Sequence, residues 1–153
     1  MKIGTCLAMT VFALILSGGW APAEERSELA DLSYSELISY GIINAYSTNL
    51  LVKTGFEAGS LTKADALDAV ERNSAFVKVL ERYAHSLKRS SVKREEGMKK
   101  LIADMCEVST YLEQQTESLK DWIGDPKSKS ARRLYDGYCD KLEKKIELML
   151  TAK

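Results

Sequence analysis

The chain has 153 residues, and its 22 lysines and arginines are balanced by 22 aspartates and glutamates, so its formal net charge is zero. This balance gives no argument for nucleic-acid binding, which is usually accompanied by a strongly basic domain. The length suits one domain with a hydrophobic core.

The first 23 residues have the pattern of a secretory signal peptide. Lys2 supplies a positive start, residues 7–17 are almost entirely apolar, and an Ala-Pro-Ala triplet ends at Ala23. We therefore predict cleavage after Ala23 and export of residues 24–153 to the periplasm or the cell exterior. Cleavage removes one lysine and no acidic residue, which leaves a charge near −1. The alternative is an uncleaved anchor, although the apolar run is shorter than the about 20 residues of a membrane span.

A first amphipathic helix is predicted to begin at Ser33 or Ser35 and to end near Phe56. Its apolar arc is broad, which indicates that other helices flank it. The side chains predicted to form its buried face are Tyr34, Leu37, Ile38, Gly41, Ile42, Ala45, Val52 and Phe56.

A second helix is predicted after a glycine-containing turn over residues 55–60. Thr62, with Asp65 three residues later, resembles a capping box and marks its start. The helix is expected to end near Arg89, before Ser90 and Ser91, where Ser91 is the predicted cap of a third helix.

The third and fourth helices form a predicted hairpin. Apolar residues recur at steps of three and four on both sides of the turn, and the fourth helix ends near Leu150. Gly124 suits a left-handed cap, Asp125 suits the N-cap of the fourth helix, and Pro126 suits its first position. Four helices with short connections predict an all-α, up-down-up-down four-helix bundle.

Cys106 and Cys139 lie at equal distances from a point beside Gly124. Because residues equally far from the turn of an antiparallel hairpin share a height, we predict a disulfide between the third and fourth helices. Cys6 leaves with the signal peptide, so an exported chain would keep an even number of cysteines, which agrees with this prediction. The alternative is two buried free thiols, since free cysteine packs as a small apolar residue.

Asn44 and Asn73 are predicted to face each other across the core. Asn73 lies on the apolar stripe of the second helix, and Asn44 lies on the first helix at the same distance from the intervening turn. One interpretation is a hydrogen-bonded pair that fixes the register of the helices. The other is a polar pocket for a small ligand.

A basic end is predicted around the turn between the second and third helices. Its six residues are Lys88, Arg89, Lys93, Arg94, Lys99 and Lys100. Such an end can dock an acidic protein, a phospholipid head group or a cell-wall polymer, and the alternative is a plain solvated surface. The seven tyrosines fall mostly on or beside apolar stripes, which predicts core positions or, alternatively, an exposed groove for a partner.

The sequence carries no recognisable catalytic motif. His85 is the single histidine, and the chain lacks the paired E-x-x-H of di-iron bundles and the C-x-x-C-H of c-type haem. A haem or copper site that pairs His85 with Met98 is the sharper alternative to a surface histidine. No nucleophile can be matched with a base. We therefore predict no catalytic residue, no metal and no cofactor.

The sequence as a whole predicts an exported, non-enzymatic helical bundle that interacts with another envelope or secreted protein. The alternative is a carrier with a small ligand or cofactor between its helices, near Asn44 and Asn73 or near His85. The architecture resembles exported four-helix bundles of the cytochrome c′ type. Because the chain lacks their haem-attachment motif, this resemblance concerns the fold and carries no function.

Overall fold

Four α-helices account for most of the chain that is described by the computed structural model, which covers residues 23–90 and 93–151. Side chains are described for residues 34–90 and 93–148. The helices are α2 (Ala23–Glu57), α3 (Lys63–Arg89), α4 (Glu96–Gly124) and α5 (Lys129–Thr151), and these ranges contain no strand. The all-α prediction is confirmed. The predicted signal peptide lies outside the described residues except for Ala23.

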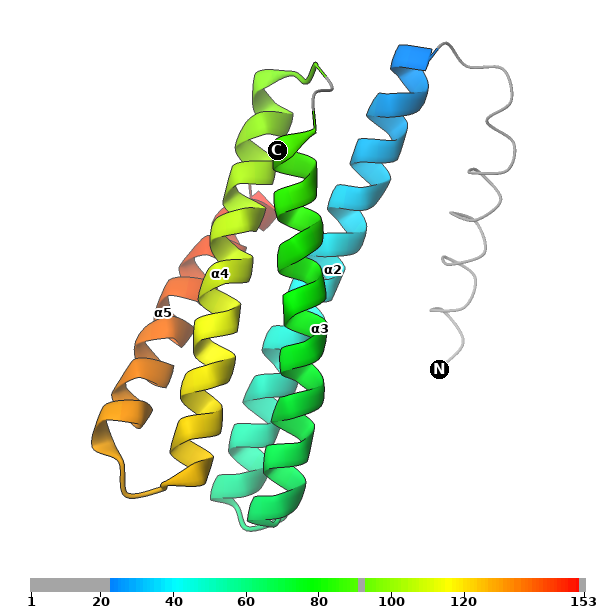
Figure 1. The fold of residues 1–153 in the computed structure, drawn as a ribbon. Helices are drawn as coiled ribbons and strands as arrows, with labels where there is room; N and C mark the ends of the chain where they lie inside the picture. Colours follow the sequence, from blue (N-terminus) through cyan, green and yellow to red (C-terminus); the bar gives the residue numbers. More distant parts are fainter. Residues whose placement is uncertain (1–22, 91–92, 152–153) are drawn as a thin grey trace.

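The helices pack side by side, and successive helices run in opposite directions (Figure 1). α3 packs against α2 and α4, α4 packs against α5, and α2 also reaches α4. The α2–α3 and α4–α5 turns lie at one end of the molecule, called here the turn end. The α3–α4 connection lies at the other, called here the loop end. The N-terminal part of α2 leans away from the other helices at the loop end (Figure 1).

The ends of the helices confirm one predicted cap and correct others. Thr62 caps α3, because its hydroxyl accepts a hydrogen bond from the Asp65 backbone N–H at 3.2 Å. At α5 the capping hydroxyl belongs to Ser128, which accepts from the backbone N–H of Ala131 at 3.3 Å. Asp125 instead stabilises the turn itself, because its carboxylate accepts from the Lys127 backbone N–H at 3.2 Å.

Two helices begin elsewhere than predicted. α2 already includes Ala23, the first residue that the structure describes, and so extends well ahead of Ser33; residues 23–33 contain no helix breaker and are rich in alanine, leucine and glutamate. α4 starts at Glu96 with Glu95 as N-cap, and the Glu95 side chain makes no capping hydrogen bond. The predicted cap, Ser91, lies outside the described residues.

The core consists of two apolar clusters, one above the other. The loop-end cluster contains Ile38, Ile42, Ala45, Tyr46, Val77, Leu80, Ala84, Ile102, Met105, Cys106, Val108, Leu112 and Leu142. The turn-end cluster contains Val52, Ala66, Val70, Leu119, Trp122, Ile123, Ala131 and Tyr135. On each of the first three helices, buried polar residues lie between the two sets, and we call them the polar layer: Asn49, Asn73, Gln115 and Thr116.

Candidate functional site

The polar layer is a hydrogen-bonded network that crosses the bundle. Asn73 Nδ2 donates to Asn49 Oδ1 at 2.7 Å, and Asn49 Nδ2 donates to Gln115 Oε1 and Thr116 Oγ1, both at 2.8 Å. Gln115 Nε2 then donates to the sulfur of Cys139 on α5 at 3.1 Å. All four helices therefore contribute to one network whose polar groups bond to one another, as buried polar groups require.

The predicted pair of Asn44 and Asn73 is wrong. Asn44 is exposed, and Asn73 bonds to Asn49 and to the carbonyl of Ala45 at 2.9 Å. The predicted position along the helix axis was close to that of the true partner, Asn49, but successive residues on a helix point about 100° apart around the axis. This rotation directs Ala45 and Asn49 inward and Asn44 outward. Of the two interpretations, the structure favours a register-fixing network, which forms with a different asparagine.

The predicted disulfide is also wrong, because Cys106 and Cys139 are both free thiols. Cys139 meets Gln115, which lies nine residues beyond Cys106 and therefore about 13 Å farther along α4. The residues between Gly124 and Lys129 form the turn and belong to neither helix, so they shift the register of α5 against α4. The α4 partners of Cys139 therefore lie closer to the turn than they would if the midpoint of the hairpin lay beside Gly124. Burial raises the pKa of both thiols, which makes them poor nucleophiles.

At the level of Cys106 along the bundle, charged side chains lie between α4 and α5. Lys145 forms ion pairs with Asp104 at 3.2 Å and with Glu107 at 2.6 Å, on either side of Cys106 along α4. The hydrogen bonds from Lys145 and then from Tyr111 lower the pKa of Glu107. Charged pairs rather than a covalent bond therefore join α4 and α5 at this level.

The seam between α2 and α5 contains two tyrosines. The Tyr46 hydroxyl donates to Glu143 Oε1 at 2.7 Å, and the Lys53 ammonium lies 5.9 Å from the centre of the Tyr135 ring. Burial, together with the hydrogen bond to Glu143, raises the pKa of Tyr46. Both rings are buried, as predicted for core tyrosines. They are therefore unavailable to a partner.

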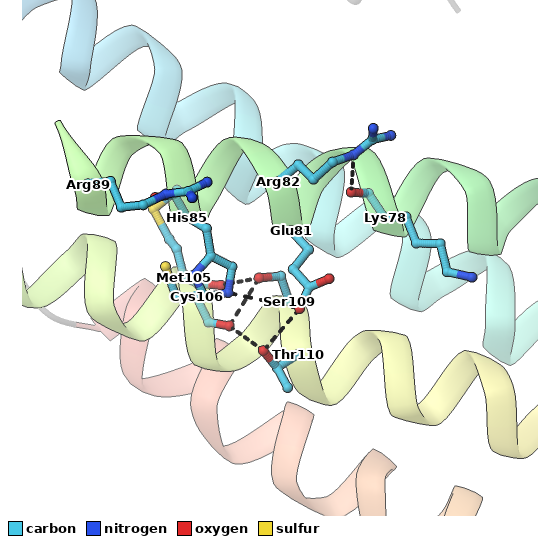
Figure 2. Close-up of polar contacts among 9 residues, drawn as sticks. All are labelled: Lys78, Glu81, Arg82, His85, Arg89, Met105, Cys106, Ser109 and Thr110. Carbon is cyan, nitrogen blue, oxygen red and sulfur yellow. Dashed lines mark hydrogen bonds and ion pairs between the residues drawn. The ribbon is translucent and has the colours of Figure 1, made fainter.

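His85 belongs to a small polar group between α3 and α4 (Figure 2). Its Nε2 lies 3.9 Å from Glu81 Oε1, and the Thr110 hydroxyl donates to the same oxygen at 3.5 Å and to the carbonyl of Cys106 at 3.0 Å. Burial raises the pKa of the Cys106 thiol, which disfavours its thiolate form. Met98 packs against the loop-end cluster.

Acidic side chains also gather on the outer side of the α3–α4 seam. Burial, followed by the nearby Glu81 carboxylate, raises the pKa of Glu113, while Lys78 opposes this effect. Lys78 also lies 3.6 Å from Glu117. Among the residues whose side chains are described, no group of three or more His, Cys, Asp or Glu is placed to hold a metal ion.

The six predicted basic-end residues do lie together around the α3–α4 connection. Lys88 and Arg89 occupy the last turn of α3, where the helix dipole favours cations. Lys99 pairs with Glu96 at 3.2 Å, and the Arg94 guanidinium donates to the carbonyl of Ser90 at 3.4 Å. Lys93 and Lys100 are exposed. The helix dipole and local pairing therefore account for part of this positive charge.

A different feature stands out on α2 and α3, where seven large apolar side chains are exposed to solvent. We call this set the α2/α3 face, and its members are Tyr34, Leu37, Tyr40, Leu51, Phe76, Val79 and Tyr83. Leu37 is 67% exposed and Tyr34 is 52% exposed, so their predicted places in the core are wrong. Tyr34 belongs to the N-terminal part of α2, the part that leans away from the other helices (Figure 1).

The α2 members of this face lie on the side of the helix that points away from α5. α2 meets α5 through Tyr46 and Lys53, as described above. At about 100° per residue, Leu37, Tyr40 and Leu51 lie on the opposite side of the helix from these two residues. The stripe is therefore free of contacts with α5.

The α3 members lie on the side that points away from α4. α3 meets α4 through Glu71, which pairs with Lys120 at 2.9 Å, and through Ser74, whose hydroxyl donates to Glu117 at 3.1 Å. The same angular argument places Phe76 and Tyr83 on the opposite side, with Val79 on the flank between them and α4. Since α2 and α3 are neighbours, the two outward sides share one surface of the bundle.

The centre of the α2/α3 face is a close approach between its two helices. A Cβ atom on Gly41 would lie 2.5 Å from Cδ2 of Leu80, so only glycine fits without movement of that side chain. Around this point residues 37–52 contain no charged side chain, which corresponds to about 24 Å of helix. Three of the four α2 members of the face lie in this charge-free stretch, and the exposed Glu36 separates it from Tyr34.

One sequence signal pointed to this face without identifying it. The broad apolar arc of the first helix predicted neighbours on both flanks, and α2 is in fact weakly amphipathic. The bundle supplies neighbours for only part of that arc. No described helix has the length and hydropathy that crossing a membrane requires. The chain matches no protein-family model, no curated protein and no solved structure.

Proposed function

We propose that the chain is an exported, non-enzymatic helical-bundle protein that binds another protein of the cell envelope or exterior through the α2/α3 face. The observation that carries the proposal is the set of seven exposed large apolar side chains beside a charge-free stretch of α2. Monomeric proteins rarely expose a large contiguous apolar patch unless it serves binding. Tyrosine and phenylalanine are also enriched in protein interfaces.

The α2/α3 face supports this function better than the basic end does. Lys88 and Arg89 are stabilised where they lie by the helix dipole, and Glu95 and Glu96 dilute the charge nearby. Exposed apolar side chains have no such local compensation, since each leaves apolar area in water. The basic end therefore acts in this proposal as a border of the interface rather than its centre.

The observations give less support to a ligand carrier. The polar layer is the obvious place for a polar ligand between the helices, but Asn49, Asn73 and Gln115 already bond to one another. A ligand would have to replace these hydrogen bonds, each at a cost of about 1–3 kcal/mol for a buried group left unpaired.

Site-specific photo-crosslinking in the cells that make the protein tests the proposed function. A photo-reactive phenylalanine analogue replaces Tyr83 or Tyr40 on the face, and Leu134 on α5 serves as the control. The control is matched, because Leu134 is 55% exposed and Tyr83 is 56% exposed. We expect protein adducts from both face positions and none from position 134. Absence of adducts from the face, or equal adducts from the control, contradicts the proposal.

Export is tested separately by the intact mass of the protein in the periplasmic or culture fraction. The signal-peptide pattern predicts a chain that begins at Glu24. A full-length mass in the cytoplasmic fraction would contradict export and leave the binding test unaffected.

A further inference from the structure

We propose that the occupant of the α2/α3 face is a second copy of the same chain, which forms a two-fold symmetric dimer. This inference rests on the proposed function, because it names the partner of the same surface. Most soluble homo-oligomers are two-fold dimers in which one patch meets its own copy. An apolar, uncharged patch satisfies the first requirement of such an interface, since it meets no like charge at its centre.

The exposed area is of the size that a dimer needs. Tyr34, Tyr40, Phe76 and Tyr83 are between 42% and 62% exposed. At about 200 Å² for a whole aromatic side chain, these four leave roughly 400 Å² of aromatic surface in water. Leu37, 67% exposed, and the other aliphatic members enlarge the patch. The total approaches the about 800 Å² that each partner contributes to a standard interface.

One pair of charges at the borders of the face, Asp65 and Lys93, is complementary under a two-fold rotation. Asp65 and Asp68 are exposed on the outward side of α3 at the turn end, where Asp68 is paired with Arg72. Lys93 is exposed at the loop end, whereas Lys88 lies toward Cys106 on α4 and is not part of this border. A two-fold axis that lies in the face perpendicular to the helices turns the loop end of one copy toward the turn end of the other, so Lys93 of each copy meets the end at which its partner carries Asp65.

The position of the axis follows from the close approach of the helices. Gly41 and Leu80 mark the middle of the face, with Tyr34 and Tyr83 on the loop-end side and Leu51 and Phe76 on the turn-end side. An axis at this point pairs the loop-end half of one patch with the turn-end half of the other. The two α2 helices then cross at their charge-free stretches, and the exposed Glu36 lies at the loop-end edge of the contact.

Sedimentation velocity over a dilution series tests the dimer on protein purified from cells that express the full-length sequence. We expect the wild type to change from twice the chain mass to the single chain mass on dilution. Leu37→Asp should raise the dissociation constant about tenfold or more, because it places a charge in the patch. Leu134→Asp is the matched control, and it should leave the dissociation constant unchanged.

A charge swap provides a second test that does not touch the apolar patch. Asp65→Lys should weaken the dimer, and adding Lys93→Asp to it should restore binding, since the two positions meet across the interface. Circular dichroism on each variant establishes that the helices are retained. A single-chain mass at every wild-type concentration, or equal effects of L37D and L134D, overturns the dimer.

The two proposals fail in different ways. If the protein sediments as a single chain while the analogue at Tyr83 still forms an adduct with a different protein, the dimer is wrong and the binding function stands. If neither a dimer nor an adduct forms, both proposals are wrong. An adduct whose mass is twice that of the chain supports the dimer and the α2/α3 face as the binding surface, with the second copy as its partner.

Discussion

Replacement of Asn49 by alanine is the sharpest test of the polar layer. Asn49 is fully buried and makes three hydrogen bonds, which connect Asn73 on α3 with Gln115 and Thr116 on α4. The alanine variant removes all three bonds. It leaves Gln115 Oε1 and one N–H group of Asn73 buried without their partners, while the Thr116 hydroxyl keeps its bond to a backbone carbonyl.

The expected loss of stability follows from these two orphaned groups. A buried polar group left without its hydrogen bond costs about 1–3 kcal/mol. Two such groups lower the free energy of unfolding by about 2–6 kcal/mol, a large part of the about 5–15 kcal/mol that is typical of a domain. Asn44→Ala is the matched control on the same helix. Its side chain is exposed, so we expect a change within about 0.5 kcal/mol.

Urea unfolding followed by circular dichroism at 222 nm measures both variants under the same conditions. Combining N49A with an alanine at position 73 completes a double-mutant cycle, in which we expect a coupling of about 0.5–3 kcal/mol. If N49A and N44A unfold with free energies within about 0.5 kcal/mol of each other, the polar layer does not stabilise the fold and the reasoning fails.

Three further predictions concern other parts of the bundle. Cys106 and Cys139 should both be alkylated in denatured, non-reduced protein. An unalkylated protein whose mass is two hydrogens lower would instead support the disulfide prediction. Gly137→Ala should stabilise α5 by about 0.5–1 kcal/mol, because the added Cβ meets open space. Gly41→Ala should give no such gain, because the added Cβ meets the buried side chain of Leu80. Urea unfolding of the two variants measures the difference. Burial raises the pKa of Glu113, so its ionised form opposes folding. Glu113→Gln should therefore raise the unfolding free energy at pH 7, and the gain should vanish below the unfolded pKa of 4.5; a gain that persists there would contradict this assignment.

The helices and their class could be predicted from the sequence because they depend on local patterns. Apolar residues at steps of three and four gave all four helices. The cap at Thr62 could also be found, because both of its hydrogen-bonding groups lie within four residues of sequence. These features need no knowledge of which helix lies beside which.

The errors arose where the register between helices decides the outcome. The disulfide prediction placed Cys106 and Cys139 at one height, but the turn takes up residues after Gly124 and shifts α5 along α4. The pairing of Asn44 with Asn73 used height and neglected rotation. A shift of one residue on a helix turns a side chain by about 100°, which is enough to move it from the core to the surface.

The α2/α3 face shows a different limit of sequence reasoning. Residues such as Leu37 and Tyr40 lie in a stretch that is apolar on nearly all sides, and a sequence pattern cannot distinguish a side covered by the same chain from one left open. The absence of charge over residues 37–52 was the available signal. It marks the part of α2 on which Leu37, Tyr40 and Leu51 stay exposed among the described helices.

The division of the core into two clusters separates residues that are close in the sequence from residues that are far apart. Members of the turn-end cluster, such as Val52 and Ala66 or Ile123 and Ala131, lie on either side of a single short turn. Members of the loop-end cluster, such as Ile38 and Ala84, are separated along the chain by most of two helices. Closing a short loop loses less chain entropy, so we expect each hairpin to close from its turn upward. The helical segments that carry most of the α2/α3 face should then be the last to settle, so that a nascent chain completes this face only once the rest of the bundle is built.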